Sequence, residues 1–344
     1  MSLGYDVAVV GATGIVGETF LELLHERKFP IENLYAVASE RSEGKTVVFA
    51  GKPKKVLNLE DFDFSTVQFA FFSAGAERSA EYAPKAAAAG CVVIDNTSQF
   101  RYDKDVPLVV PEVNPEALSD YRKRNIIANP NCSTIQLVVA LKPIYDAVGV
   151  SRVNIATYQS VSGAGREAVV ELARQTAQLL NGQSIRPTVF PEQIAFNAIP
   201  HIDVFQENGY TKEEMKIVWE TQKILGDPNI KVNPTAVRIP VFYGHSEAVH
   251  IETKKPMTPK KAKSVWAKAP GIRVVDDKNT YPTIISHAAN QDDVFVGRIR
   301  KDISCSNGLN FWVVADNLRK GAALNAIQIA EWLIKKNFYI ASKS

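Results

Sequence analysis

The feature that most constrains the fold is a short apolar strand that runs into three glycines and then into a helix-like segment. Residues 5–10 read YDVAVV, residues 11–17 read GATGIVG, and ETFLELLHERKF follows. Glycines there let the backbone approach a pyrophosphate, and the free N–H groups of a helix start attract its charge. Gly11, Gly14 and Gly17 have the spacing G-x-x-G-x-x-G, which alone is a weak signal. The prediction therefore depends on the strand before the glycines and the helix after them. The alternative is a tight turn that binds nothing.

Short β-rich runs recur after this unit. They read NLYAVAS, VQFAFFSAG and CVVIDNTS, and the alanine-rich SAEYAPKAAAAG lies between the last two. Strands that alternate with helices predict a parallel sheet with helices on both faces. The pattern continues to about residue 130. We therefore predict an α/β chain whose residues 1–130 form a Rossmann-like, dinucleotide-binding domain.

The alternation of predicted strands and helices ends after residue 130. A helix predicted from 133 to about 147 precedes RVNIATYQSVSG, a predicted helix at 165–181 and a proline-rich irregular span at 186–205. The later runs AVRIPVFY, EAVHIET and LNFWVVAD lie close together with few helices between them, which is typical of antiparallel strands. Residues 131–319 are therefore predicted to form a second α+β domain with a mixed, largely antiparallel sheet.

Composition excludes several classes of function. The 40 basic and 37 acidic residues give a net charge of +3, too small for a nucleic-acid-binding surface. No apolar run reaches the roughly 18 residues of a membrane span, and no signal-peptide pattern opens the chain. The three cysteines are widely spaced, without the pairing of metal ligands, and fit a reducing cytoplasm. We expect a cytoplasmic protein with no metal and no nucleic-acid or membrane partner.

The end of the second predicted strand bears on which dinucleotide binds. NAD enzymes usually place an acid there to hold the ribose 2′-hydroxyl. Here the strand ends in Ser39, and Arg41 and Ser42 follow. An arginine and hydroxyls suit a 2′-phosphate, which favours NADP, although Glu40 places an acid beside the expected position.

The segment IIANPNCSTIQLVVALKPI, residues 126–144, places Cys132 before an apolar, helix-like run. Pro130 disfavours helix before it, and Ser133 and Thr134 suggest that a helix begins there. A thiol with an ordinary pKa of about 8.5 is mostly protonated at neutral pH, but a helix N-terminus favours the thiolate. Position therefore favours a nucleophile, and the alternative is a buried structural cysteine.

Seven motifs then mark a resemblance that covers nearly the whole chain. They are GATGIVG, FFSAG, NPNCSTIQ, QSVSGAG, ETQKIL, RIPVFYGHSEAV and VADNLRKGAA. Together they resemble the bacterial aspartate-semialdehyde dehydrogenases. The resemblance implies NADPH-dependent, reversible reduction of L-aspartyl 4-phosphate to L-aspartate 4-semialdehyde through a cysteine acyl-thioester. That reaction serves lysine, threonine, methionine and diaminopimelate biosynthesis. The alternatives are a reductase for another acyl phosphate, such as N-acetyl-glutamyl phosphate, and a non-catalytic NADP-binding paralogue.

The resemblance also implies catalytic roles. Cys132 matches the nucleophile, Asn131 would orient the intermediate, and Gln159 matches the substrate-orienting glutamine. His245 matches the acid/base. In an unbroken strand His250, five positions later, would face the opposite way from His245.

Substrate contacts follow in the same way. The resemblance assigns Arg238 to the substrate carboxylate and Arg101 to phosphate, and it assigns Glu220 with Lys223 to the substrate amine and the phosphate region. Lys216 is a second candidate for phosphate. Taken alone, MKIVWETQK reads as a surface helix with solvated charges.

The same resemblance places the cofactor and the partner subunit. The implied cofactor contacts are Gly11, Thr13, Gly14, Ile15 and Val16 at the pyrophosphate, Ser39, Arg41 and Ser42 at the 2′-phosphate, Ser73, Ala74 and Gly75 near the ribose, and Ser162, Gly163 and Asn317 at the nicotinamide. An amphipathic C-terminal helix, 320–344, would complete the NADP-binding domain. A homodimer or a dimer of dimers is expected.

Overall fold

The computed structural model describes residues 4–336, which fall into two compact units. The first runs to Asn131 and resumes at Ala322, and the second is Cys132–Gly321. These boundaries lie within two residues of the predicted 1–130 with 320–344 and 131–319. The end of the predicted C-terminal helix, 337–344, lies outside the described residues.

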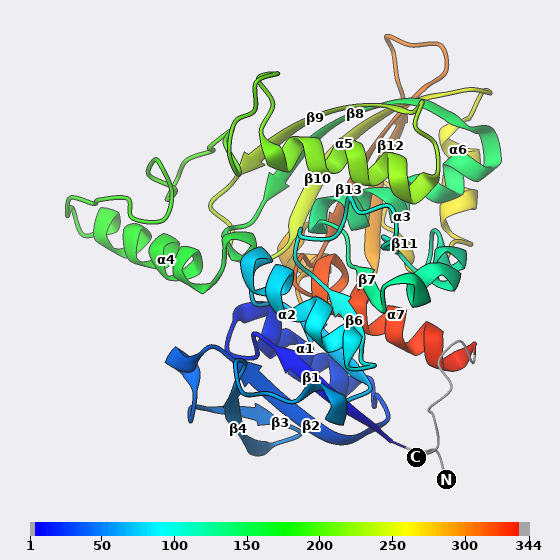
Figure 1. Ribbon diagram of the computed structural model, residues 1–344. Coiled ribbons are helices and arrows are strands. Elements are labelled where there is room, and N and C mark those ends of the chain that lie inside the picture. The colour runs from blue at the N-terminus through cyan, green and yellow to red at the C-terminus, as the bar shows by residue number, and fades with distance from the viewer. Residues whose placement is uncertain (1–3, 337–344) are drawn as a thin grey trace. The chain divides into compact units, whose positions relative to one another are not determined.

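The first unit is built on a seven-stranded sheet with the order β3-β4-β2-β1-β5-β6-β7 (Figure 1). All neighbouring strands pair in parallel except the β3–β4 hairpin. The strands are β1 (Tyr5–Val10), β2 (Ile31–Ala38), β3 (Thr46–Phe49), β4 (Lys52–Asn58), β5 (Phe69–Phe72), β6 (Val92–Asp95) and β7 (Ile126–Ala128). The predicted Rossmann-like architecture is confirmed.

Helices cover this sheet, and one of them comes from the end of the chain. They are α1 (Ile15–Glu26), α2 (Ala76–Ala88) and α7 (Leu324–Lys335). Ile327 of α7 shares a buried apolar core with Phe20 of α1 and Phe71 of β5. Arg27 and Glu331 add an ion pair of 2.7 Å between the ends of α1 and α7. The apolar face of the C-terminal helix thus completes the core of the first unit.

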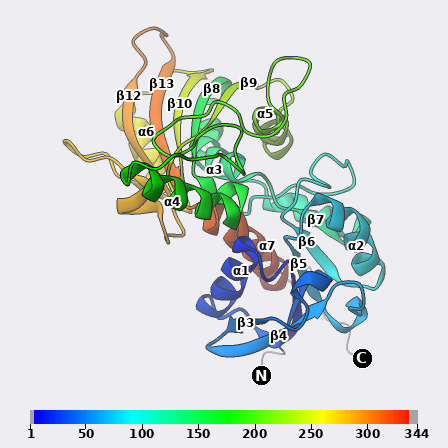
Figure 2. The ribbon, with the colours of Figure 1, turned by 90° about the vertical axis from the view of Figure 1, so that its left-hand side faces the viewer.

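The second unit contains a six-stranded sheet with the order β11-β12-β13-β10-β8-β9 (Figure 2). The three inner pairs, β12–β13, β13–β10 and β10–β8, are antiparallel, whereas the outer pairs β11–β12 and β8–β9 are parallel. The strands are β8 (Val150–Gln159), β9 (Lys231–Arg238), β10 (His245–Thr253), β11 (Ile272–Val274), β12 (Val294–Lys301) and β13 (Gly308–Ala315). The predicted mixed, largely antiparallel sheet is confirmed.

One strand ends earlier than the run AVRIPVFY predicts. β9 stops at Arg238, and the residues after it turn back through a hydrogen bond from the Val241 N–H to the Ile239 carbonyl. Pro240 has no N–H to donate, so the strand ladder does not continue through it. Arg238 consequently lies at a strand end.

Four α-helices belong to the second unit: α3 (Cys132–Val148), α4 (Arg166–Leu180), α5 (Lys212–Leu225) and α6 (Pro259–Trp266). α3 packs against β8, β10, β12 and β13, and α5 packs on β9. Short 3-10 and π-helical segments occupy Glu40–Ser42, Phe64–Thr66, Pro115–Lys123, Val161–Ala164, Ile284–Ala288 and Arg319–Ala323. Within residues 4–336 no helix is long and apolar enough to cross a membrane.

Candidate active site

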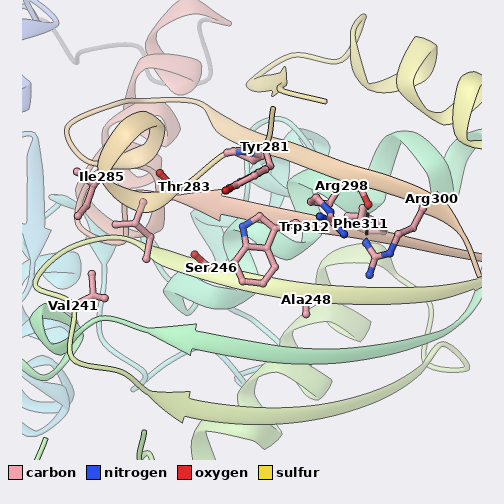
Figure 3. A pocket seen from close by; sticks show the side chains of 12 residues that line it. Val241, Ser246, Ala248, Tyr281, Thr283, Ile285, Arg298, Arg300, Phe311 and Trp312 are labelled. Carbon is pink, nitrogen blue, oxygen red and sulfur yellow. Dashed lines mark hydrogen bonds between the residues drawn. The ribbon is translucent and has the colours of Figure 1, made fainter. Parts of the chain in front are cut away.

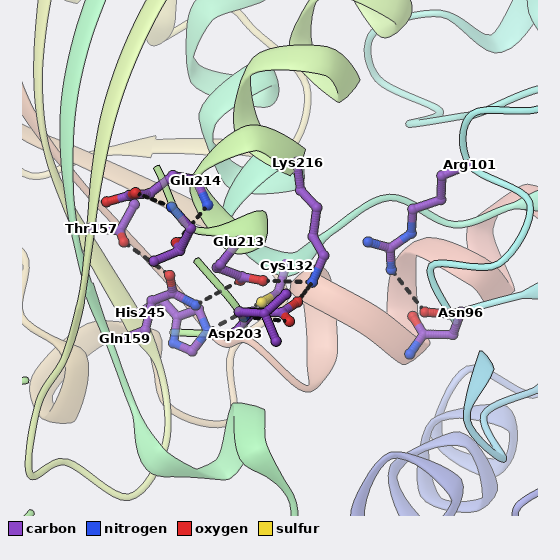
Figure 4. A network of polar contacts seen from close by, with 12 residues as sticks. Asn96, Arg101, Cys132, Thr157, Gln159, Asp203, Glu213, Glu214, Lys216 and His245 are labelled. Atoms are coloured by element: carbon purple, nitrogen blue, oxygen red, sulfur yellow. Dashed lines mark hydrogen bonds and ion pairs between the residues drawn. The ribbon is translucent and has the colours of Figure 1, made fainter. Parts of the chain in front are cut away.

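The predicted nucleophile lies at the first residue of a helix. α3 begins at Cys132, and the Cys132 Sγ lies 3.2 Å from Nε2 of His245, the first residue of β10 (Figure 4). Cys132 is partly exposed, whereas His245 is fully buried. The helix N-terminus favours the thiolate form of the sulfur. A thiol and an imidazole that are 113 positions apart in the sequence are therefore brought into contact.

The other ring nitrogen of His245 faces the segment that follows β8. The Ser160 backbone N–H donates to His245 Nδ1 at 3.1 Å, and the Ser160 hydroxyl lies 3.2 Å from the same atom. Burial and then the positive charge of Arg238 lower the pKa of His245 to about 3, although the Gly244 backbone and Glu213 act in the opposite direction. The imidazole is therefore neutral at neutral pH.

Asn317 holds the surrounding backbone in place. Its side-chain oxygen accepts the Gly244 N–H at 2.7 Å and the Ser160 and Ser162 hydroxyls at 3.2 Å each. Asn317 and Ser162 are almost fully buried. Since buried polar groups of this kind are costly to leave unpaired, the network fixes the start of β10 relative to the end of β8.

Three strand ends bring the remaining polar side chains to one edge. In the ladder, Gln159 of β8 lies opposite both Arg238 of β9 and His245 of β10. Arg238 is buried and donates to the Ser160 carbonyl at 2.7 Å. An arginine with an ordered head group at a strand edge is suited to a carboxylate ligand.

The first turn of α5 adds charges to this edge. Gln159 donates to Glu213 at 3.1 Å, and Lys216 contacts Glu213 at 2.9 Å and Asp203 at 2.8 Å (Figure 4). Thr157 fixes the Gln159 amide by donating to its oxygen at 2.9 Å. Burial alone would lower the pKa of Lys216, but Glu213 and Asp203 raise it, so the ammonium stays charged.

The glycine loop of the first unit forms a second site. Gly11 has a φ of +89°, and a Cβ there would lie 2.6 Å from the Ser73 carbonyl oxygen. A Cβ at Gly17 would lie 2.1 Å from the Gly11 carbonyl oxygen. Side chains are therefore excluded where strand, turn and helix meet, as a dinucleotide-binding turn requires.

A cavity of about 620 Å³ opens beside this turn. It is lined by Gly11, Thr13, Gly14, Ala38, Ser39, Glu40, Arg41, Leu59, Glu60, Ser73, Ala74 and Arg78. The free N–H groups at the start of α1 and the two arginines suit phosphate oxygens. The chemistry of the lining thus fits a phosphorylated dinucleotide.

Known proteins match both units. Residues 6–121 match the model of the semialdehyde dehydrogenase NAD binding domain, and residues 141–320 match that of the semialdehyde dehydrogenase dimerisation domain. An aspartate-semialdehyde dehydrogenase of Legionella pneumophila is 63% identical over 99% of this chain and 98% of its own length. One from Bacillus subtilis is 49% identical over 98% of this chain and 99% of its own. The chain belongs to the aspartate-semialdehyde dehydrogenase family.

Solved structures support the same family. Aspartate semialdehyde dehydrogenase II of Vibrio cholerae, complexed with ASA, has a TM-score of 0.96 at 61% identity and covers 97% of this chain and 99% of its own. The Candida albicans enzyme with NADP has a TM-score of 0.78 at 26% identity, over 98% of this chain and all of its own. Together with the NAD binding domain match, these relatives support a nicotinamide dinucleotide as the cofactor.

One predicted pair does not lie with the others. Glu220 and Lys223 follow Glu213 and Lys216 by seven residues, which is about 10 Å along α5. Glu220 is fully buried there. The spacing E-x-x-K occurs twice in this helix, and only the copy beside the Thr211 cap reaches Gln159. Glu213, which the motifs missed, and the second candidate Lys216 therefore lie at the strand edge, whereas Glu220 and Lys223 lie further along α5.

Two predicted site residues belong to the first unit. Arg101 follows β6, is buried and donates to the Asn96 carbonyl at 2.9 Å. Asn131 immediately precedes Cys132 and is also buried.

The predicted cofactor residues divide between the units. Gly11, Thr13, Gly14, Ser39, Arg41, Ser73 and Ala74 line the cavity. Ile15 and Val16 open α1, Gly75 precedes α2, and Ser42 accepts a hydrogen bond from Thr13 at 3.3 Å. Ser162, Gly163 and Asn317 lie beside His245 and Arg238 in the second unit.

Arg78 lines the same cavity and was not predicted. It lies in the first turn of α2, and its guanidinium is 3.9 Å from Glu60. Its position in the sequence, three residues after the glycine that ends FFSAG, could have indicated that Arg78 lines the cavity. Among residues 4–336, no three His, Cys, Asp or Glu side chains form a group that could hold a metal ion.

Proposed function

We propose that this protein reduces L-aspartyl 4-phosphate to L-aspartate 4-semialdehyde with NADPH, reversibly, in the biosynthesis of lysine, threonine, methionine and diaminopimelate. The observation that carries the proposal is Cys132 at a helix start with its Sγ 3.2 Å from a buried histidine. Cys132 attacks the acyl phosphate, phosphate leaves, and an acyl-thioester remains. A thioester accepts hydride far more readily than a carboxylate does.

The charged groups at the strand edge suit an amino-acid substrate. Arg238 would bind the α-carboxylate as a two-pronged donor, and Glu213 would bind the ammonium group. Gln159, held between Thr157 and Glu213, would orient the reacting acyl group. Lys216 and Arg101 are the proposed phosphate contacts, and Asn131 would help to orient the intermediate.

We propose NADP rather than NAD, because Arg41 and Arg78 both line the cavity beside the glycine turn. When bound, the nicotinamide supplies or accepts the hydride. The backbone of Gly11, Thr13 and Gly14 would hold the pyrophosphate. Ser162, Gly163 and Asn317 would line the nicotinamide end. A cytoplasmic location is part of the same proposal.

We further propose a homodimer, since the second unit matches a dimerisation domain. The sheet face opposite α3 carries a cavity of about 590 Å³ (Figure 3). Ala248 and Trp312 line it together with Tyr281 and Ile285, which are exposed. A second copy would cover this apolar face. A monomer in sedimentation experiments would contradict the proposal, and a tetramer would indicate a dimer of dimers.

Turnover in the oxidative direction tests the proposed reaction. The protein is mixed with aspartate semialdehyde, NADP and phosphate, and NADPH is followed by absorbance. Without phosphate we expect a burst of about one NADPH per site that then stops, because acyl-enzyme accumulates. Sustained NADPH production without phosphate would show that water completes the cycle. Turnover with N-acetyl-glutamate semialdehyde alone would assign the substrate to the related reductases.

A further inference from the structure

One fully buried asparagine joins three segments of the first unit. Asn129 follows β7, and its side-chain nitrogen donates to the Ala322 carbonyl at 3.1 Å and to the side-chain oxygen of Asn96 at 2.7 Å. Its side-chain oxygen accepts a hydrogen bond of 2.7 Å from the Asn325 amide. Because a buried amide is costly to leave unpaired, these contacts hold the residues after β6, the residues after β7 and the start of α7 together.

Backbone carbonyls determine which way these amides point. A carbonyl oxygen can only accept, so the Asn129 atom that faces Ala322 must be the nitrogen. The Asn325 nitrogen is assigned in the same way, because it lies 3.0 Å from the Val109 carbonyl oxygen. Asn129 therefore presents a donor, and not an acceptor, to the side chain of Asn96.

Asn96 lies in the turn that leads from β6 to Arg101. Its backbone N–H donates to the Phe72 carbonyl at 2.9 Å, and its own carbonyl accepts the Arg101 guanidinium at 2.9 Å (Figure 4). The carboxylate of Asp95, the preceding residue, accepts the backbone N–H and the hydroxyl of Thr97 at 2.9 and 2.8 Å. The carbonyl that supports the guanidinium thus belongs to a residue whose backbone and side chain are both held.

A guanidinium that is held before its ligand arrives binds with a smaller loss of conformational freedom. Arg101 is buried, and its printed contact is the carbonyl of the residue that Asn129 holds. A change at Asn129 should therefore reach Arg101 through Asn96, although Asn129 itself makes no contact with the guanidinium in this chain of hydrogen bonds.

We propose that Asn129 is a positioning residue for phosphate: its amide holds Asn96, and the Asn96 carbonyl holds the Arg101 guanidinium in place for a phosphate oxygen. This inference rests on the proposed function, in which Arg101 contacts phosphate. The alternative is that Asn129 only joins segments of the fold and has no effect on any one ligand.

Asn129→Ala tests the proposal during oxidation of aspartate semialdehyde with NADP. The variant loses the side-chain amide but keeps the backbone N–H, which donates to the Asp95 carbonyl at 2.8 Å. The KM for phosphate should rise about threefold to tenfold, the usual effect of losing a neutral hydrogen bond. The KM values for aspartate semialdehyde and NADP should not change. Equal increases in all three KM values would overturn the proposal.

The burst of NADPH without phosphate provides a second readout. Formation of the acyl-enzyme and transfer of hydride use no phosphate, so the amplitude and rate of the burst in Asn129→Ala should match those of the wild type. A smaller or slower burst would show that the substitution disturbs the segment leading to Cys132, three residues later, and would contradict a role limited to phosphate.

A matched control comes from another buried asparagine of the first unit. Asn114 accepts the Val110 N–H and donates to the Leu108 carbonyl, each at 2.9 Å. Asn114→Ala should lower the melting temperature and leave the KM for phosphate unchanged. A comparable rise of that KM in Asn114→Ala would overturn the proposal. Should Asn129→Ala not fold, Asn129→Ser leaves a smaller void, and the same KM changes are expected because the shorter hydroxyl does not replace the amide.

A double-mutant cycle tests whether Asn129 acts through Arg101. Arg101→Ala alone should raise the KM for phosphate about tenfold to a hundredfold, because a charge-assisted contact is lost. In the Arg101→Ala background, Asn129→Ala should add no further increase, since the group that it positions is absent. The same increase in both backgrounds would show that Asn129 acts independently of Arg101.

A crystal structure of Asn129→Ala tests the positioning without any turnover. The Arg101 guanidinium should leave the Asn96 carbonyl in the variant. An unchanged guanidinium would overturn the positioning role alone, whichever reaction the protein catalyses. If instead the wild type needed no phosphate for steady oxidation, the proposed function would fall, so the two failures are distinguishable.

Discussion

The two candidate sites are built in different ways. The cavity in the first unit is shaped by backbone, because glycines let a strand, a turn and a helix meet closely, and its arginines lie at an open rim. The site in the second unit is shaped by side chains. Its histidine, glutamine, glutamate and arginine are buried and fixed by hydrogen bonds from several segments.

The difference matches what each site has to do. A pyrophosphate is bound by backbone N–H groups and charge, which tolerate small shifts of the ligand. A reacting carbonyl needs the nucleophile and the donors placed within a fraction of an ångström. Substitutions of the side chains around Cys132 should therefore change turnover and substrate affinity, whereas those that line the cavity beside the glycine turn should change cofactor affinity.

The sharpest test of this division is the nucleophile. Cys132→Ser should lower turnover by about 10⁴-fold or more, since removing a nucleophile abolishes the covalent route. Because Cys132 does not line the cavity beside the glycine turn, NADP affinity measured by fluorescence should not change. Cys305→Ser, a change at another partly exposed cysteine, should leave both quantities unchanged. Loss of NADP affinity in Cys132→Ser would contradict the division.

Two neighbouring glutamates separate function from folding within α5. Glu213→Gln removes the charge that pairs with Lys216 beside Gln159, so the KM for aspartate semialdehyde should rise about tenfold to a hundredfold. Glu214 instead accepts the backbone N–H groups of Thr211 at 2.7 Å and Ala236 at 3.0 Å.

Glu214→Gln should therefore cost about 1 kcal/mol of stability, the usual effect of a weakened helix cap, with little change in KM. Steady-state kinetics and thermal melts of the two variants provide the comparison. An unchanged KM in Glu213→Gln would return the sequence-based pair, Glu220 and Lys223, to consideration.

The sequence predicts the backbone-shaped site more completely than the site that is built from side chains of several segments. Gly11, Gly14 and Gly17 are close in sequence, so their spacing with the adjoining strand and helix suffices to predict the turn. Cys132 was predicted because Pro130 and the following residues mark a helix start. Glu213 was missed because two copies of E-x-x-K occur in one helix. Only the contact with the end of β8 distinguishes them, and that pairing is not encoded locally.

The arginines of the first unit should have a smaller effect. Arg41→Ala and Arg78→Ala should each weaken NADP binding by about tenfold to a hundredfold, the usual cost of losing a charge-assisted contact. NAD lacks the 2′-phosphate, so its affinity provides the control within the same experiment. Equal losses for both cofactors would show that the arginine in question does not contact that phosphate.

The smallest effect on activity is expected at a buried carboxyl that lies near the catalytic pair but outside it. Glu247 is two residues after His245 on the same side of β10, and it is fully buried. Neither of its oxygens has a hydrogen-bond partner of normal geometry among residues 4–336. Burial raises its pKa well above the usual range, and Gln136 of α3 lowers it only in part.

The sign of the pH effect on stability follows from that shift. The pKa of Glu247 is higher in the folded protein than its unfolded value of about 4.3. Its stabilising contribution is therefore complete below about pH 4.3 and is lost as the pH rises through the folded value.

Glu247→Gln is neutral in both states. Its stability relative to wild type should rise from about pH 4 to about pH 8, while turnover stays close to that of wild type. Urea unfolding at both pH values measures this difference. A difference that stays constant with pH would mean that Glu247 is ionised in the folded protein, and burial would then not raise its pKa.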